Sequence, residues 1–354
     1  MKMCIFATCN RRIMKFPRLV LFICALAFAV QGCKKEDDDI KLYLSGSLEL
    51  ATKMPRYVIS GQKYDFVPSG LSASDGTHVA YYFTKPITSD KDTIMSKKFP
   101  AQKYTYTVPD SLSTWQLTCV GYAEDSQDYY TSSIAQTFVV VDPRLNEGTL
   151  KGFRMFPGDE TSEIRGDSYY THAIGNTIWM RQNLAYIEGS EADGWNFGHP
   201  YYESDAMRTI FGSFYTWEEA RKACPSGWHL PSDQEWVDLL KKGGAPDDLK
   251  PLEESPCGAG KLMDWFYFNG EKMWEYYRDV DVTNDLYLSA IPAGYAIVND
   301  KSYDYKGYGQ YAAFWTSDEI EGKGVYRYIY MESDKVFVDR ASKTGFAASV
   351  RCVR

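Results

Sequence analysis

The chain has 354 residues, a formal net charge of −8 and 24% charged residues. An acidic chain lacks the clustered basic surface that binds nucleic acid, so we expect no nucleic-acid partner. Tyrosine is used heavily, with 28 copies against 18 of phenylalanine and 9 of tryptophan. A tyrosine ring packs like an apolar side chain and keeps a polar tip, which suits strands and binding surfaces alike.

The first 32 residues are typical of an export signal. Basic residues between positions 11 and 18 precede an apolar stretch from Leu19 to Val30, which is too short to span a bilayer, where about 20 residues are needed. The stretch ends in Gly32-Cys33, which resembles the lipobox of bacterial lipoproteins. The resemblance implies that residues 1–32 are removed and that Cys33 receives a lipid. An ordinary secretory signal and an uncleaved anchor are the alternatives.

Residues 33–39 are expected to form an acidic tether, with Lys34 and Lys35 followed by four acidic residues. A charge run behind an anchor is usually solvated. This run also resembles the export tag of Bacteroidetes surface lipoproteins, which implies an outer-membrane lipoprotein exposed on the cell surface. An anchor that faces the periplasm is the alternative. Because residues 1–32 hold five basic and no acidic residues, their removal lowers the net charge from −8 to −13.

Residues 40–142 are predicted to form an all-β domain, because short apolar or alternating runs recur between turn residues. About seven such strands over a hundred residues favour an immunoglobulin-like sandwich, although only Cys119 of the usual cysteine pair is present. We expect Cys119 to be a buried free thiol and the domain to be a spacer, with a binding sandwich as the alternative. The polar segment 142–148 marks the boundary. The predicted strands are Leu42–Leu44, Tyr57–Ile59, Tyr64–Val67, Val79–Phe83, Tyr104–Val108, Trp115–Val120 and Thr137–Val141.

Two short helices are predicted in the second half, and no convincing helix precedes Thr216. Thr216 and Glu219 have the spacing of a capping box, in which the two side chains bond the free N–H groups of a helix start. Ser232 and Glu235 repeat this spacing. Helices flanked by strands indicate an α+β domain.

The remainder of this half is predicted to be strand and loop. Residues 257–310 are rich in aromatic residues and glycine, with few helix signals. After the loop, four strands are expected to form a terminal antiparallel meander. An entry strand precedes the helices at Thr177–Met180, and the four later strands are Phe314–Ser317, Gly324–Met331, Lys335–Asp339 and Phe346–Cys352. The four cysteines outside the signal and lipid site, Cys119, Cys224, Cys257 and Cys352, could pair in three ways.

Several motifs in this half resemble the Fibrobacter succinogenes major paralogous domain, which is common in lipoproteins of Bacteroidetes and their relatives. We assign residues 147–354 to it, with the resemblance running from about residue 165. The family is largely uncharacterised, so the resemblance implies no reaction. The matching segments are Ile174–Leu184, Phe214–Trp217, Cys224–Ser232 with Glu235-Trp236, Ser289–Tyr295, Ala313–Ser317 and Ser349–Cys352.

The order of these motifs is also similar to the wider C-type-lectin-like fold. In that fold a helix carrying Trp-x-x-Ala and a cysteine is tied to a cysteine of the C-terminal strand, which implies a Cys224–Cys352 disulfide. Cys257 is then unpaired or, as an alternative, joined to Cys224. The Glu-Pro-Asn and Gln-Pro-Asp triplets of calcium-dependent sugar binders are absent, so we expect no calcium site and no other cofactor or metal.

No catalytic constellation is visible. The chain has four histidines, His78, His172, His199 and His229, and it lacks a zinc-binding helix, nucleophile elbow or phosphate loop. We therefore expect a non-catalytic, lectin-like module for ligand binding or adhesion, with a glycan or a protein as the ligand. The alternative is a secreted hydrolase or a protein-modifying enzyme on a fold like that of formylglycine-generating enzymes.

Ligand contacts are predicted on the long-loop side of the second domain. The first three candidate tyrosines lie in a stretch rich in glycine and aspartate that has no apolar period, so a packing role is not obvious for them. Tyr326, Tyr328 and Tyr330 share one face of a strand. Arg327 favours exposure of the opposite face, which argues against these three. The predicted contact residues are Tyr303, Tyr305, Tyr308, Tyr311, Asp318 and Glu319.

Overall fold

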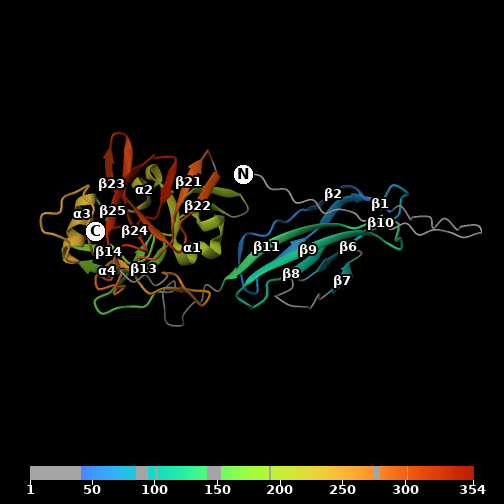
Figure 1. The fold of residues 1–354 in the computed structure, drawn as a ribbon, viewed down its shortest axis with the longest axis horizontal. Coiled ribbons are helices and arrows are strands. Elements are labelled where there is room, and N and C mark those ends of the chain that lie inside the picture. The colour runs from blue at the N-terminus through green and yellow to red at the C-terminus, as the bar shows by residue number, and fades with distance from the viewer. Residues whose placement is uncertain are drawn as a thin grey trace, which may run out of the picture. The chain divides into compact units, whose positions relative to one another are not determined.

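The computed structural model of the chain is mostly β (Figure 1). Cys33, the predicted tether and the predicted boundary at 142–148 lie outside the described residues. Every helix in the described part of the chain follows residue 200, as the concentration of helix signals in the second half predicts. The structure describes residues 41–84, 95–99, 103–141, 153–190, 193–274, 280–300 and 302–354.

Eleven strands precede residue 142 in the described residues. A five-stranded sheet has the order β3-β11-β9-β6-β7, in which only the β3–β11 pair is parallel. The remaining strands form the pairs β1–β10, β2–β5 and β4–β8. The bounds are β1 Leu42–Tyr43, β2 Ser45–Leu50, β3 Tyr57–Ile59, β4 Lys63–Phe66, β5 Pro68–Ser72, β6 Val79–Thr84, β7 Met95–Phe99, β8 Tyr104–Thr107, β9 Thr114–Ala123, β10 Tyr129–Tyr130 and β11 Ser132–Val141.

One apolar core joins the five-stranded sheet to the pairs β2–β5 and β4–β8. Phe66 of β4 packs on Phe83 of β6, with ring centroids 5.6 Å apart, and Tyr106 of β8 lies at 5.8 Å from Phe138 of β11. Cys119 lies in the same core, where burial raises the pKa of its thiol to about 12. The prediction that Cys119 is a buried free thiol is therefore confirmed.

The second half is built from several small sheets. A five-stranded sheet has the order β17-β18-β26-β21-β22, and two three-stranded sheets are β12-β13-β14 and β23-β24-β25. Two hairpins, β15–β16 and β19–β20, complete the strands. The strand bounds are β12 Glu160–Ile164, β13 Asp167–Ile174, β14 Thr177–Met180, β15 Glu188–Ser190, β16 Gly194–Phe197, β17 His199–Pro200, β18 Ser213–Thr216, β19 Tyr267–Phe268, β20 Glu271–Lys272, β21 Tyr295–Asn299, β22 Ser302–Lys306, β23 Tyr311–Ile320, β24 Lys323–Tyr330, β25 Val336–Ala341 and β26 Phe346–Ala348.

The helices of this half are short, and both predicted capping boxes are present. The side chains of Thr216 and Ser232 each accept the N–H of a glutamate three residues later, and each glutamate bonds back. Helix α2 packs closely on β24, where a Cβ on Gly324 would lie 2.3 Å from the ring of Trp217. The helices are η1 Tyr201–Glu203, α1 Asp205–Phe211, α2 Trp217–Ala223, α3 Asp233–Lys242 and α4 Ala259–Leu262.

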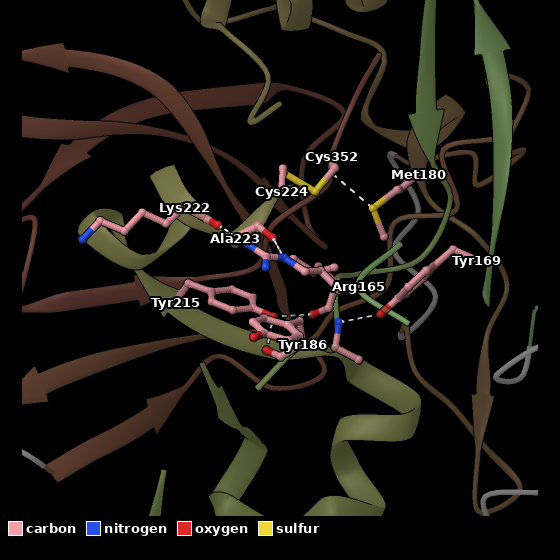
Figure 2. The surroundings of a disulfide bond; sticks show 11 residues. Arg165, Tyr169, Met180, Tyr186, Tyr215, Lys222, Ala223, Cys224 and Cys352 are labelled. Atoms are coloured by element: carbon pink, nitrogen blue, oxygen red, sulfur yellow. Dashed lines mark hydrogen bonds between the residues drawn. A yellow bond between two sulfur atoms is a disulfide. The ribbon is translucent and has the colours of Figure 1, made fainter. Parts of the chain in front are cut away.

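A disulfide joins Cys224, at the end of α2, to Cys352, as the resemblance to the C-type-lectin-like fold implied (Figure 2). Cys352 is fully buried, and its N–H donates to the sulfur of Met180 at 3.3 Å. The guanidinium of Arg165 donates to the last two carbonyl oxygens of α2 at 2.6 and 2.9 Å. The arginine thus satisfies acceptors that a helix end leaves free. Cys257 is a free thiol.

Two predictions about this half are wrong. Helix α1 precedes Thr216, where no helix was expected. Its seven residues span too few turns for a clear periodic pattern, although Ser204 and Gly212 flank it as helix-boundary residues. The terminal meander has three strands, β23 to β25, because β26 instead pairs with β18 and β21.

Candidate functional site

The structure separates the six predicted contact residues into three places. Tyr303 and Tyr305 lie on β22 with Tyr308 close behind, Tyr311 begins β23, and Asp318 and Glu319 lie near the far end of β23. The six residues therefore do not form one binding surface.

The first group packs in an aromatic core. Tyr305 is 8% exposed and its hydroxyl donates to the carbonyl oxygen of Pro200 at 2.8 Å. Tyr303 stacks on His199 at 3.8 Å between ring centroids, and Tyr308 stacks on Tyr201 at 5.1 Å. Burial raises the pKa of all three tyrosines. All three therefore have a packing role, which was not obvious from the sequence, and β22 turns the alternate rings of Tyr303 and Tyr305 into the core.

Asp318 and Glu319 have partners within the fold. The carboxylate of Asp318 accepts the N–H of Asp233 at 2.6 Å, in the first turn of α3, where free N–H groups favour an anion. Glu319 pairs with Lys343 at 2.6 Å. Asp318 therefore stabilises the start of a helix, and Glu319 remains partly exposed beside its lysine.

Tyr311 belongs to a row of rings on the sheet β23-β24-β25. In the register of the sheet, Tyr311 lies opposite Tyr330, and Tyr328 lies opposite Phe337. The centroids of these two stacked pairs are 4.7 and 4.8 Å apart. Tyr328 connects the pairs, at 6.2 Å from Tyr311, and it also lies 5.8 Å from Tyr326. We call these five partly exposed rings the tyrosine face.

The opposite face of β24 is the buried one, which reverses the prediction based on Arg327. Arg327 is 0% exposed and donates to both carboxylate oxygens of Asp233, at 2.6 and 2.7 Å. Its remaining amino group donates to the carbonyl oxygen of Glu253 at 2.9 Å. Val325 and Ile329 on the same face are each 1% exposed. A charged residue can face a core when it is paired and hydrogen-bonded, and here it is.

Three carboxylates act on the tyrosine face, and the exposed Lys335 lies beside Tyr330 in the strand register. Burial, then Asp339 and Glu254, raise the pKa of Tyr328. Burial and Glu332 raise the pKa of Tyr311. All three carboxylates belong to exposed residues. The surface therefore combines apolar rings with more exposed carboxylates than cations.

A pocket of about 210 Å³ lies at the end of the sheet where Tyr311 and Tyr330 stack. Gln310 and Met331, the neighbours of these two tyrosines in the chain, line it together with Met273 and Glu271. The hydroxyl of Tyr308, which also lines the pocket, donates to the sulfur of Met273 at 3.7 Å.

The model of the Fibrobacter succinogenes major domain matches residues 173–354. The chain belongs to this family. No curated protein and no solved structure shows significant similarity to the chain.

Three motifs of the Fibrobacter succinogenes major domain meet at one buried arginine. Arg351, in the last motif, is 0% exposed and donates to the side-chain oxygen of Asn183 at 2.7 Å. It also donates to the carbonyl oxygens of Leu288 and Ser289 at 2.8 and 3.1 Å. Desolvation by burial lowers the pKa of Arg351. The arginine therefore ties distant segments of the domain together.

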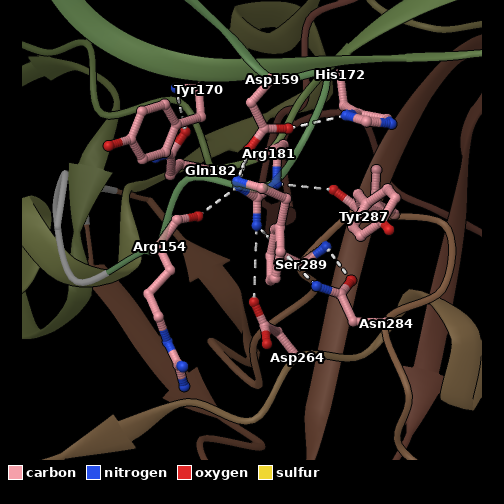
Figure 3. Close-up of polar contacts among 12 residues, drawn as sticks. Arg154, Asp159, Tyr170, His172, Arg181, Gln182, Asp264, Asn284, Tyr287 and Ser289 are labelled. Carbon is pink, nitrogen blue, oxygen red and sulfur yellow. Dashed lines mark hydrogen bonds and ion pairs between the residues drawn. The ribbon is translucent and has the colours of Figure 1, made fainter.

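A second buried arginine holds the long segment after α4 (Figure 3). Arg181 donates to the carboxylate of Asp159 at 2.5 Å and to the carbonyl oxygen of Tyr287 at 3.0 Å. It also donates to the hydroxyl of Ser289. His172 bonds the other oxygen of Asp159 at 2.9 Å. These side chains are enclosed, so we interpret the Arg181 network as a scaffold. The polar run Arg181-Gln-Asn183 directly after the apolar strand β14 was the sequence signal for it.

No group of three or more histidine, cysteine, aspartate or glutamate side chains is arranged to hold a metal ion in the described ranges. His229 bonds Glu235 at 2.8 Å. Burial lowers the pKa of His199 to about 4, so its ring is neutral at pH 7.

Proposed function

We propose that the protein is a surface-anchored lipoprotein whose C-terminal domain displays a non-catalytic surface for ligand binding or adhesion. We further propose an immunoglobulin-like sandwich as its N-terminal part and a C-type-lectin-like fold for the Fibrobacter succinogenes major domain. The core shared by the five-stranded sheet and the pairs β2–β5 and β4–β8 supports the first assignment. The disulfide from the end of α2 to the C-terminal segment supports the second.

The tyrosine face carries the binding proposal. Five aromatic side chains in mutual contact remain partly exposed on one sheet, and contiguous exposed apolar surface marks interaction sites. Tyrosine suits this role because a rigid ring with a hydroxyl tip loses little conformational entropy on binding.

Removal of three rings is expected to weaken ligand binding strongly. The full chain with Tyr311, Tyr328 and Tyr330 replaced by leucine would be applied to an array of glycans and cell-surface extracts. Loss of a central aromatic cluster should reduce every specific signal about tenfold or more. Leucine retains apolar packing, and an unchanged thermal unfolding midpoint would show that the fold persists.

Tyr267→Leu is the matched control, because Tyr267 is 51% exposed on the separate hairpin β19–β20. Equal signals from wild type and triple variant would contradict the proposal.

Lipid attachment is expected to depend on Cys33. The Cys33→Ala variant should lose both incorporation of labelled palmitate and partitioning into the detergent phase, because the thiol is the proposed attachment point. None of the helices in the described residues is long and apolar enough to cross a membrane.

Surface exposure is tested separately. Protease added to whole cells should degrade the wild-type protein. Full resistance in intact cells, with cleavage after lysis, would contradict surface exposure.

The alternative is a hydrolase or a protein-modifying enzyme on a fold like that of formylglycine-generating enzymes. Those modifiers use a neighbouring pair of redox or copper-binding cysteines. In the described residues, Cys224 and Cys352 are bonded to each other, Cys119 is buried in the N-terminal core and Cys257 lies just before α4. This arrangement gives the alternative no support. A panel of hydrolase and thiol-oxidation assays, run beside the binding array, separates the two classes.

A further inference from the structure

We propose that the tyrosine face binds an extended segment of a partner protein that carries lysine or arginine at alternate positions. This inference rests on the proposed binding function and names the ligand class. It depends on the spacing of the rings and on the charge around them.

The ring spacing matches an extended peptide. Tyr326, Tyr328 and Tyr330 recur at every second residue of β24 and point to the same side. Alternate residues of a strand are about 6.6 Å apart, and an extended peptide presents its own alternate side chains at the same interval. A peptide lying along β24 can therefore place side chains over Tyr328 and Tyr330, whereas the ring of Tyr326 packs on Phe346, with centroids 4.8 Å apart.

The charge of the surroundings selects cationic side chains. Asp339, Glu254 and Glu332 are exposed carboxylates that act on Tyr328 and Tyr311. The face of a tyrosine ring attracts an ammonium or guanidinium group, and the carboxylates add a second favourable term. An acidic glycan or peptide would meet like charge at the same rim.

The test uses the full chain and synthetic probes. An octapeptide of alternating lysine and glycine is compared with its glutamate–glycine and serine–glycine counterparts, and with a hexamer of glucosamine, by isothermal titration. We expect only the lysine peptide to bind, with an affinity that falls as salt is raised. Tyr328→Leu should weaken binding about three- to tenfold, whereas Tyr328→Phe should retain it, because phenylalanine preserves the ring face.

The carboxylates provide a second set of variants. Glu254→Gln and Glu332→Gln should each weaken binding of the lysine peptide, while Glu163→Gln, which removes an exposed charge on β12, should not. Preference for the glucosamine hexamer or the glutamate peptide, or lysine-peptide binding that ignores Tyr328→Leu, would overturn the inference. A different result would contradict the proposed binding function, namely that the triple leucine variant binds the array as well as the wild type does.

Discussion

Removal of the Cys224–Cys352 disulfide is expected to lower the free energy of unfolding by about 4 to 5 kcal/mol. The bond joins residues 128 positions apart, and a closed loop of that length greatly restricts the unfolded chain. The variant Cys224→Ala/Cys352→Ala should therefore unfold at much lower denaturant concentration. Tryptophan fluorescence follows the domain directly, because every tryptophan except Trp115 lies within residues 173–354.

The free thiol provides the control for this experiment. Cys257 is partly exposed and its thiol contacts the carbonyl oxygen of Gly244 at 3.6 Å. Cys257→Ala should change the free energy of unfolding by less than about 1 kcal/mol. An unchanged unfolding midpoint in the double alanine variant would show that the disulfide does not stabilise the folded domain. A disulfide-linked peptide of Cys224 and Cys257 in non-reducing peptide mapping would contradict the pairing itself.

The Asp233→Asn variant is expected to lose about 3 to 5 kcal/mol of folding free energy. Asp233 and Arg327 are both 0% exposed, and the aspartate is the carboxylate that receives the guanidinium. Asparagine has nearly the same size and can still accept the N–H of Leu252, which the wild-type carboxylate binds at 2.7 Å. The expected loss of folding free energy therefore measures the cost of leaving the guanidinium of Arg327 buried without a counterion.

A double variant tests this reason. Adding Arg327→Met to Asp233→Asn should recover part of the lost stability, because it removes the unpaired charge. The exposed pair Arg340–Glu321 is the control, and Glu321→Gln should cost less than about 1 kcal/mol. If Asp233→Asn unfolds at the wild-type midpoint, the ion pair between α3 and β24 contributes nothing, and the buried face of β24 is held by its apolar residues alone.

Local features of this chain were predictable from short segments. The capping boxes at Thr216 and Ser232 are present, because a hydroxyl and a glutamate three residues apart satisfy the same helix start wherever the helix packs. Strand β14 lies at Thr177–Met180, as its apolar run predicts. The family motifs were also visible in the sequence, and the family match over residues 173–354 confirms that resemblance.

The candidate site was only partly predictable. Tyr311 was selected, but for membership in a loop rather than for its place opposite Tyr330. Tyr326, Tyr328 and Tyr330 were given less weight because Arg327 was expected to face water. That expectation failed because the counterion, Asp233, is 94 residues away in the chain. The alternation of residues along β24 shows which side chains share a face, but it cannot show which of the two faces is buried.

The sequence by itself determined the export signal pattern, the helix starts, the division of residues between the faces of each strand and the family. Tertiary structure alone decided which faces are buried, and it separated Tyr303, Tyr305 and Tyr308 from Tyr311. It also sent β26 into a sheet with β18 and β21 rather than onto the meander. The physical reason is the same in each case. Capping and side-chain alternation act within a few residues, whereas the pairing of strands and the burial of a charge depend on partners that are distant in the chain.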